Sequence, residues 1–227
     1  MEYRPLGRTG LYVSTICLGT MTWGGRGRWE AIGQVGQEAV NEQLKCAVEA
    51  GVYFIDTANV YHEGWSEELL GQAIRDTGIP REDLVIATKV RGRMRSGING
   101  MGLTRVHIHH EVDASLRRLG LDHIDLYQIH GLDPLTPIDE TLWSLDDLVR
   151  SGKVRYIGIS NQAAWRIAKA NEIAKANRWS RFESVQAYYT LAGRDLDREI
   201  LPMCREESLG VMVWSPLAGG LLSGKFD

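Results

Sequence analysis

Four polar residues stand at or just after the ends of apolar segments, and their side chains together could transfer a proton. Asp56 ends the segment YFID and Tyr61 follows it, Lys89 closes LVIATK, and His130 closes IDLYQIH. Nearly continuous apolar segments are typical of parallel strands buried on both faces, where a charge at the carboxyl end has no structural use. In a barrel of parallel strands, these ends meet at one mouth. We therefore expect an acid, a phenol, an ammonium and an imidazole in one proton-transfer site.

The segments that must position these residues alternate between strand-like and helix-like patterns. A short hairpin, EYRPLGRTGLYVS, opens the chain with GRTG as its turn. One of the helices is predicted from Ser66 to Thr77, with Ser66 as its N-cap. The predicted strands are ICLGTM, YFIDTA, LVIATKV, HIDLYQIH, VRYIGIS, SVQAYY and VMVWSPL, with a helix-like segment between each pair.

Strict alternation of this kind predicts a parallel sheet with helical crossovers. The chain has no GxGxxG motif, which disfavours a doubly wound dinucleotide fold. We predict one domain over residues 1–227, an α/β fold of the (β/α)8 TIM-barrel type with an N-terminal β-hairpin, of which only seven strands are encoded. The domain is expected to be C-terminally incomplete, without the eighth strand and the last helices. Because an open barrel exposes two unpaired edges, we expect a longer natural product or another element that closes the seam.

Composition and charge exclude several classes of function. The 227 residues are 44% hydrophobic and 24% charged, and the formal net charge of −3 provides no basic surface for nucleic acid. No segment resembles a signal peptide or a membrane span, so no membrane partner is expected. The widely spaced Cys17, Cys46 and Cys204 form no metal-spaced pair and indicate reduced thiols in a cytoplasmic protein. In the run HIHH, His107 and His110 share a helix face, but no carboxylate or cysteine ligand is evident nearby, so we predict no metal site there.

Several motifs resemble those of the aldo-keto reductase family, and they follow the family's order along the whole chain. They are GRTGLYVSTICLGTMTWG, GVYFIDTANVY, SEELLGQAI, LVIATKV, SLRRLGLDHIDLYQIHG, GKVRYIGISN and VMVWSPLAGGLLSGKF. The resemblance implies a (β/α)8 barrel, NADPH as the reductant and reduction of a small-molecule carbonyl to an alcohol. Measured against the family, the chain lacks the eighth strand, the basic segment for the adenosine 2′-phosphate and a substrate loop from the C-terminal tail.

Reduction of a carbonyl needs a hydride on carbon and a proton on oxygen, and the four polar residues suit the proton transfer. Tyr61 is the predicted general acid, although a free phenol with a pKa of about 10 is a poor donor at neutral pH. Lys89 is expected to lower this pKa by favouring the phenolate, and Asp56 to hold Lys89 in place. His130 is expected to hydrogen-bond the substrate carbonyl. The resemblance implies the same four roles, and general acid catalysis of this kind contributes on the order of 10²–10⁴-fold.

Each of the four residues also has an ordinary structural role when it is considered alone. Asp56 suits a helix cap, and Tyr61 suits a wall residue whose hydroxyl is satisfied. Lys89 suits a surface ion pair, and His130 suits a core histidine bonded to the backbone. Because four such residues would meet at one mouth, a catalytic set explains them better than four separate coincidences.

The resemblance also assigns residues to a cofactor groove. Ser160 and Asn161 end the fifth predicted strand, and with Gln186 they match positions that bind the nicotinamide carboxamide. Trp214 matches an aromatic residue that stacks on the nicotinamide ring, although barrel packing explains it equally well from the residues alone. These side chains are therefore expected at the same mouth as the catalytic set.

Residues before the first predicted helix complete the expected mouth. Asp56 and the turn Gly19–Thr20–Met21 are expected to face the nicotinamide ribose. Trp23 and Trp29, in the Gly-rich loop that follows, either wall the substrate pocket or pack in the core.

The segment GGLLSGKF is close to a phosphate-binding loop, but Phe226 stands where Ser or Thr must bind magnesium. A nucleoside triphosphatase is therefore disfavoured. Its glycine N–H groups and Lys225 still suit a phosphate, and the resemblance places Ser215, Leu217, Gly219 and Lys225 along the pyrophosphate. A flexible chain end is the alternative.

An NADPH-dependent carbonyl reductase is the leading interpretation, and three others stay open. A Schiff-base aldolase would use a barrel lysine beside an acid and a tyrosine, although Ser160, Asn161 and Trp214 argue against it. A non-catalytic nucleotide-sensing subunit would not need the four catalytic positions that this chain retains. A truncated fragment of a reductase would bind the cofactor weakly.

Overall fold

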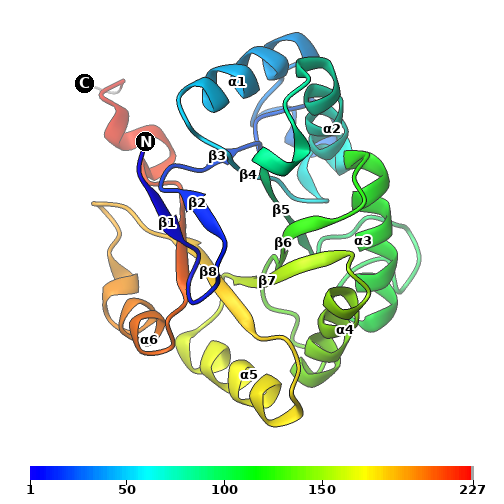
Figure 1. Ribbon diagram of the computed structural model, residues 1–227, viewed down its shortest axis with the longest axis vertical. Coiled ribbons are helices and arrows are strands. Elements are labelled where there is room, and N and C mark those ends of the chain that lie inside the picture. The colour runs from blue at the N-terminus through cyan, green and yellow to red at the C-terminus, as the bar shows by residue number, and fades with distance from the viewer. Residues whose placement is uncertain (226–227) are drawn as a thin grey trace.

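A seven-stranded parallel sheet forms the centre of the computed structural model, which describes residues 1–225. Its strands lie side by side in chain order, and a helix connects each strand to the next. The sheet curls into part of a (β/α)8 barrel with the helices outside it (Figure 1), as the alternation of segments predicted. The strands are β3 (Leu18–Gly19), β4 (Phe54–Asp56), β5 (Val85–Val90), β6 (Ile124–Ile129), β7 (Val154–Ser160), β8 (Phe182–Tyr188) and β9 (Gly210–Trp214).

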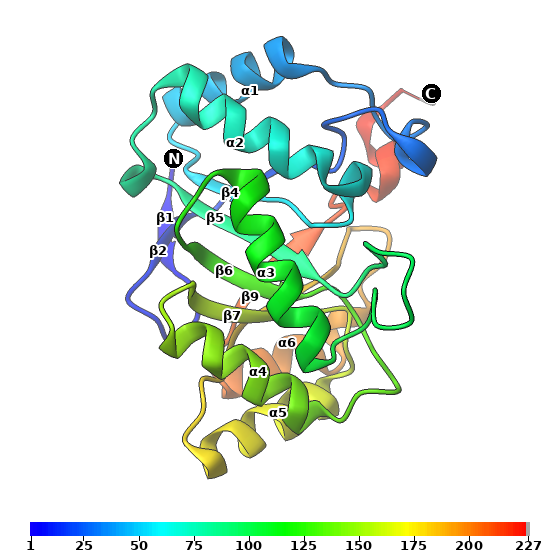
Figure 2. The same ribbon diagram turned by 90° about the vertical axis from the view of Figure 1, so that its right-hand side faces the viewer.

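The α-helices cover the outer face of the sheet (Figure 2). They are α1 (Gln37–Glu49), α2 (Trp65–Thr77), α3 (Arg105–Leu119), α4 (Ile138–Arg150), α5 (Ala164–Asn177) and α6 (Ile200–Glu206). Short 3₁₀ segments lie in the connections: η1 (Gly27–Trp29), η2 (Tyr61–Gly64), η3 (Arg81–Asp83), η4 (Asp195–Asp197) and η5 (Ala218–Ser223).

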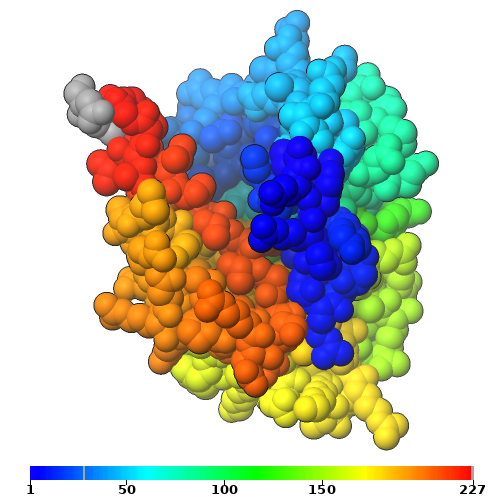
Figure 3. Space-filling view, turned by 60° about the vertical axis from the view of Figure 1, so that its left-hand side comes forward, coloured from blue at the N-terminus to red at the C-terminus, as the bar shows by residue number. Residues whose placement is uncertain are grey.

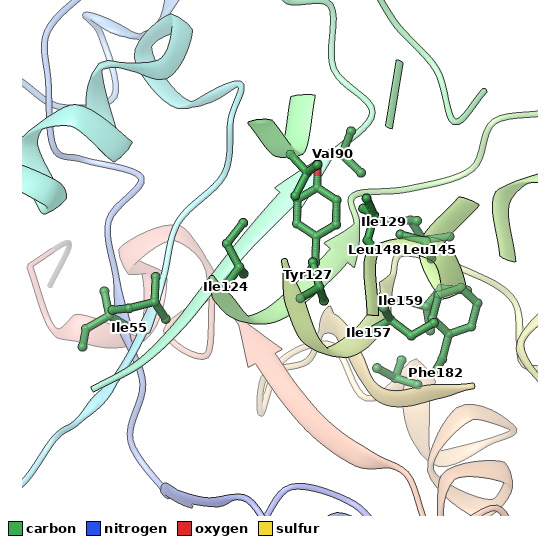
Figure 4. Packing of buried hydrophobic residues seen from close by; sticks show 14 of the residues in the cluster. Ile55, Val90, Ile124, Tyr127, Ile129, Leu145, Leu148, Ile157, Ile159 and Phe182 are labelled. Atoms are coloured by element: carbon green, nitrogen blue, oxygen red, sulfur yellow. The ribbon is translucent and has the colours of Figure 1, made fainter. Parts of the chain in front are cut away.

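The main hydrophobic core fills the space between the sheet and the helices. Leu145 and Leu148 of α4 belong to the same cluster as Tyr127, Ile157 and Phe182 of the sheet (Figure 4), and none of these side chains is more than 1% exposed. Full burial of a large apolar side chain contributes roughly 1.5–3 kcal/mol. This packing fixes the strands, and the strands in turn fix the residues at their carboxyl ends.

Inside the barrel, the inward-facing residues form an apolar layer near the amino ends of the strands and a polar layer above it. Alternate residues of a strand point to the same face. The apolar layer is the cluster of Leu6, Phe54, Ala87, Leu126 and Met212. Two positions after Phe54, Ala87 and Leu126 stand Asp56, Lys89 and Gln128. The period of a strand therefore places polar side chains toward the carboxyl ends.

The predicted N-terminal hairpin is confirmed. Its strands, β1 (Tyr3–Pro5) and β2 (Tyr12–Ser14), pair antiparallel. Leu6, the residue directly after β1, packs into the apolar layer of the barrel. Gly7 follows with a φ of 61°. A Cβ atom on Gly7 would lie 2.5 Å from the carbonyl oxygen of Glu183, so only glycine allows the hairpin to approach the barrel this closely.

The predicted N-cap of α2 was wrong by two residues. The helix begins at Trp65 with Gly64, at a φ of 96°, in the N-cap position. Ser66 lies inside the helix, and its hydroxyl donates to the carbonyl oxygen of Thr20 at 2.9 Å. The sequence pattern correctly indicated that the Ser66 side chain forms a hydrogen bond. The partner, however, is Thr20 on a distant segment and not a backbone N–H group of α2.

The outer strands of the sheet are β3 and β9. The hairpin lies on the same side of the molecule as β9: a Cβ atom on Gly210 would lie 2.8 Å from Cδ1 of Leu6. Figure 3 shows this face, with the blue hairpin beside the orange and red C-terminal segments. A large cavity opens here, and the residues at the carboxyl ends of the strands line part of it.

Candidate active site

The four residues of the predicted proton-transfer set come together at the carboxyl ends of neighbouring strands. Asp56 is the last residue of β4, Lys89 is the penultimate residue of β5, and His130 directly follows β6. Tyr61 begins the 3₁₀ turn η2 that leads from β4 into α2. The structure therefore brings together side chains that are separated by up to two strand–helix units in the sequence.

Lys89 is fully buried, and its ammonium has three oxygen partners. Nζ donates to Oδ2 of Asp56 at 2.5 Å, to the carbonyl oxygen of Thr57 at 2.8 Å and to the hydroxyl of Tyr61 at 3.4 Å. Burial lowers the pKa of Lys89, but the carboxylate of Asp56 and the hydroxyl of Tyr61 together raise it above its ordinary value. Lys89 therefore stays charged at neutral pH.

The pKa of Tyr61 moves in the direction opposite to the expectation. Burial raises it, and this effect exceeds the opposing influence of the Lys89 ammonium, while the Asp56 carboxylate raises it further. The net pKa lies above the ordinary value for tyrosine. The phenol consequently holds its proton throughout the neutral range, and Lys89 limits the rise without reversing it.

His130 lies beside Tyr61, and the two rings meet edge to face with centroids 5.7 Å apart. Burial lowers the pKa of His130 to about 3, and the positive charges of Lys89 and Arg91 act in the same direction. The imidazole is therefore neutral at physiological pH, with one N–H donor and one acceptor nitrogen.

Two glutamines complete the surroundings of Asp56, and the sequence argument did not assign a role to the first. Nε2 of Gln128 and Nε2 of Gln186 donate to Oδ1 of Asp56 at 2.9 and 3.0 Å. Both oxygens of the carboxylate therefore have partners, since Oδ2 accepts from Lys89. Strand periodicity could have identified Gln128, because it stands on β6 two residues before His130 and pairs in register with Lys89.

A cavity of about 980 Å³ extends along the open side of the partial barrel, from Leu6 beside the hairpin and Gly210 at the start of β9 to residues at the carboxyl ends of the strands. Its wall includes Tyr61, His130 and these residues from the predicted cofactor set: Gly19, Thr20, Met21, Asp56, Asn161, Gln186, Trp214 and Ser215. Four predicted cofactor residues do not line it: Ser160, Leu217, Gly219 and Lys225. The first group converges on one space, whereas the last three stand in and around η5, past the end of β9.

Asn161, Ser160 and Trp214 form one hydrogen-bonded group at this cavity. Nδ2 of Asn161 donates to Oγ of Ser160 at 2.9 Å and to the carbonyl oxygen of His130 at 3.1 Å. Oδ1 of Asn161 accepts from Nε1 of Trp214 at 3.0 Å. The Trp214 ring is 41% exposed and packs against Tyr188, with centroids 4.9 Å apart. The Asn161 amide and the partly exposed Trp214 line the same cavity as Asp56, and an amide and an aromatic ring suit a nicotinamide.

The two tryptophans of the first loop have different roles. Trp23 is only 1% exposed and donates from Nε1 to Oε1 of Gln43 at 2.7 Å, so it belongs to the core. Trp29 lines the cavity, and its ring meets the edge of Tyr61 at a centroid distance of 5.5 Å. Of the two, Trp29 is therefore the pocket wall.

Residues 1–225 contain no cluster of three or more histidine, cysteine, aspartate or glutamate side chains that could hold a metal ion. Within the HIHH run, Nε2 of His107 lies 3.2 Å from the carbonyl oxygen of Gly92, and Nδ1 of His110 lies 3.0 Å from Glu111. Across the same described residues, none of the helices has the length and apolar character needed to cross a membrane.

Comparison with known proteins agrees with this geometry. Residues 15–227 match the Aldo/keto reductase family. The chain is 42% identical to YrpG, an uncharacterized oxidoreductase of Bacillus subtilis, over 99% of this chain and 69% of that protein. It is 39% identical to versiconal hemiacetal acetate reductase of Aspergillus parasiticus, over 98% of this chain and 69% of that protein. It is 40% identical to norsolorinic acid reductase of Emericella nidulans, over 93% of this chain and 56% of that protein. The chain therefore belongs to the aldo/keto reductase family.

Proposed function

We propose that this protein is an NADPH-dependent oxidoreductase that reduces aldehydes or ketones to alcohols. The observation that carries the proposal is the contact of one buried ammonium with both a carboxylate and a phenol. Nζ of Lys89 bonds Oδ2 of Asp56 at 2.5 Å and the hydroxyl of Tyr61 at 3.4 Å, and Tyr61 lines the large cavity. Two of the relatives described above, versiconal hemiacetal acetate reductase and norsolorinic acid reductase, are named as reductases, which supports the same general class of reaction.

The donor groups of the cavity suit a nicotinamide cofactor. Asn161 and Gln186, which line the cavity, would hold the carboxamide, with Ser160 accepting from Nδ2 of Asn161 behind them. Trp214, which is 41% exposed, would stack on the ring. Asp56 and the turn from Gly19 to Met21 line the same space. When it is bound, the cofactor supplies the hydride for the substrate carbon.

Tyr61 would donate the proton to the substrate oxygen. Its raised pKa keeps the phenol protonated before reaction, and the adjacent Lys89 ammonium would stabilise the phenolate that remains afterwards. Asp56 keeps Lys89 charged and in place. His130, held neutral by burial, would donate a hydrogen bond to the carbonyl oxygen and orient it toward Tyr61.

A Schiff-base mechanism fits the geometry less well. Attack by an amine requires the neutral form of the lysine. The carboxylate of Asp56 and the hydroxyl of Tyr61 outweigh burial and raise the pKa of Lys89, so that the ammonium is favoured. The same contacts occupy Nζ with three oxygen acceptors.

Two measurements on the purified chain test the proposal. Fluorescence titration with NADPH, and with NADH in parallel, should show saturable binding, tighter for NADPH. Incubation with para-nitrobenzaldehyde should consume NADPH and form the alcohol in equal amounts. Binding without turnover would favour a nucleotide-sensing role. Absence of binding by either nucleotide would refute the reductase proposal for this chain, and borohydride trapping of an aldehyde on Lys89 would establish the aldolase instead.

A further inference from the structure

The residue after the proposed acid, His62, adopts a backbone conformation that a residue with a Cβ atom rarely takes. His62 has φ 49° and ψ 36°, and Glu63 follows with φ 61° and ψ 33°. The left-handed region is unfavourable for all residues except glycine and, to a lesser extent, asparagine and aspartate. Two consecutive residues in this region persist only where surrounding contacts compensate, and such outliers cluster at functional sites.

The compensating contacts come from the imidazole of His62, which is fully buried against the first loop. The backbone N–H groups of Gly25 and Arg26 donate to Nδ1 at 2.9 and 3.3 Å. On the other side of the ring, Nε2 lies 2.9 Å from the carbonyl oxygen of Met21. Because Nδ1 accepts and a carbonyl can only accept, the proton must reside on Nε2, so the neutral tautomer matches both contacts.

The loop is also shaped to receive this ring. A Cβ atom on Gly24 would lie 2.4 Å from Cγ of His62, so a side chain at residue 24 would displace the imidazole. Gly27 similarly packs against the carboxylate of Glu63, with Oε1 2.6 Å from a Cβ built on Gly27. Both left-handed residues therefore direct their side chains onto the same loop.

This loop provides one wall of the proposed active site. Met21 and Trp29 both line the cavity that contains Tyr61. The Trp29 ring lies with its centroid 5.5 Å from that of Tyr61 and 6.0 Å from that of His62. A single imidazole thus connects the segment at Met21, the turn from Gly24 to Arg26 and the chain that bears the proposed acid.

We propose that His62 is a specificity-determining positioning residue, which latches the loop over Tyr61 so that Trp29 forms a fixed wall for flat aromatic carbonyl substrates. This inference rests on the proposed reductase function and deepens it. An aromatic aldehyde reaches the Trp29 wall while its carbonyl lies at Tyr61, whereas a small aliphatic aldehyde contacts Tyr61 and His130 without needing that wall. Release of the latch therefore affects the two substrates differently.

The kinetic test compares para-nitrobenzaldehyde with propanal in the His62→Gly variant. Glycine adopts the left-handed conformation without strain, so no new steric strain accompanies the loss of the imidazole. We expect kcat/KM for the aromatic aldehyde to fall at least about tenfold, mainly through KM, and for propanal to change less than about twofold. His62→Asn, which tolerates the same backbone, should restore part of the aromatic activity. Equal losses for both aldehydes, or no loss for either, would overturn the proposal.

Limited proteolysis tests the latch without any need for reductase activity. Trypsin cleavage after Arg26 should be about tenfold faster in His62→Gly than in the wild type, because the loop opens more often when its buried hydrogen bonds are lost. Glu30→Ala, an exposed change in the same loop, should leave the rate unchanged. Unchanged cleavage in His62→Gly would refute the latch. If the wild type reduces neither aldehyde, the proposed function fails while this measurement still decides the latch.

Discussion

The ammonium of Lys89 lies 2.5 Å from Oδ2 of Asp56, and both groups sit inside the barrel on adjacent strands. Because Oδ1 of Asp56 accepts from two glutamine amides, the carboxylate is fixed in place. The ammonium held in this way also donates to the hydroxyl of Tyr61, which lines the cavity.

Tyr61→Phe removes only the proposed proton donor. We expect kcat for carbonyl reduction to fall by on the order of 10²–10⁴-fold, the range that general acid catalysis contributes. NADPH affinity should be nearly unchanged, since the ring is retained. Steady-state kinetics and fluorescence titration measure the two quantities. The exposed Tyr12→Phe serves as the matched control, and a Tyr61→Phe enzyme with more than about a tenth of wild-type activity would exclude Tyr61 as the acid.

Lys89→Met breaks a buried ion pair and leaves the Asp56 carboxylate uncompensated. Loss of one partner of such a pair typically lowers the free energy of unfolding by roughly 3–5 kcal/mol. The double variant Asp56→Asn with Lys89→Met should recover a large part of that stability, because no unpaired charge remains, but neither variant should reduce carbonyls. Urea unfolding and NADPH consumption provide the two readings. Recovery of activity together with stability in the double variant would show that the pair has a structural role only.

His130 should make the fold less stable in mild acid. Burial lowers its pKa to about 3 in the folded state, whereas an unfolded histidine titrates near about 6.5. Between these values the unfolded chain binds the proton and the folded chain does not, so stability decreases as the pH falls. The slope is up to about 1.4 kcal/mol per pH unit. Urea unfolding at pH values between about 4 and 7 should show this slope reduced in His130→Gln; identical slopes in both proteins would contradict the buried neutral imidazole.

Asn59 should hold the turn that carries Tyr61. It is fully buried, its Nδ2 donates to Oε2 of Glu111 on α3 at 3.1 Å, and its N–H donates to the carbonyl oxygen of Lys89 at 3.2 Å. Asn59→Ala leaves Glu111 with one partner fewer, which should cost about 1–3 kcal/mol of stability, and should lower kcat more than it raises KM. Glu111→Gln, which keeps an acceptor oxygen, should be milder. A stability loss with unchanged kcat would assign Asn59 to folding alone.

The order of elements could be predicted from the sequence because each signal is local. The apolar runs around Ile86 and Leu126 and the helical periods between them depend on neighbours a few residues away. The same runs placed Asp56, Lys89 and His130 at strand ends, and parallel topology then brought those ends together. The N-cap at Ser66 failed because its hydroxyl bonds to Thr20, a residue that is distant in the chain.

The contacts inside the site depended on the tertiary structure. Gln128 and Gln186 both donate to Asp56, yet neither is near it in the sequence. The direction in which the pKa of Tyr61 shifts likewise depends on the fold. The sequence suggested that the Lys89 charge lowers this pKa, but not that burial of Tyr61 raises it by more. Local patterns thus determined which elements form and in which order. The burial of Tyr61 and the hydrogen-bond partners of Asp56 were decided only by packing, because they arise between segments that meet only in the folded chain.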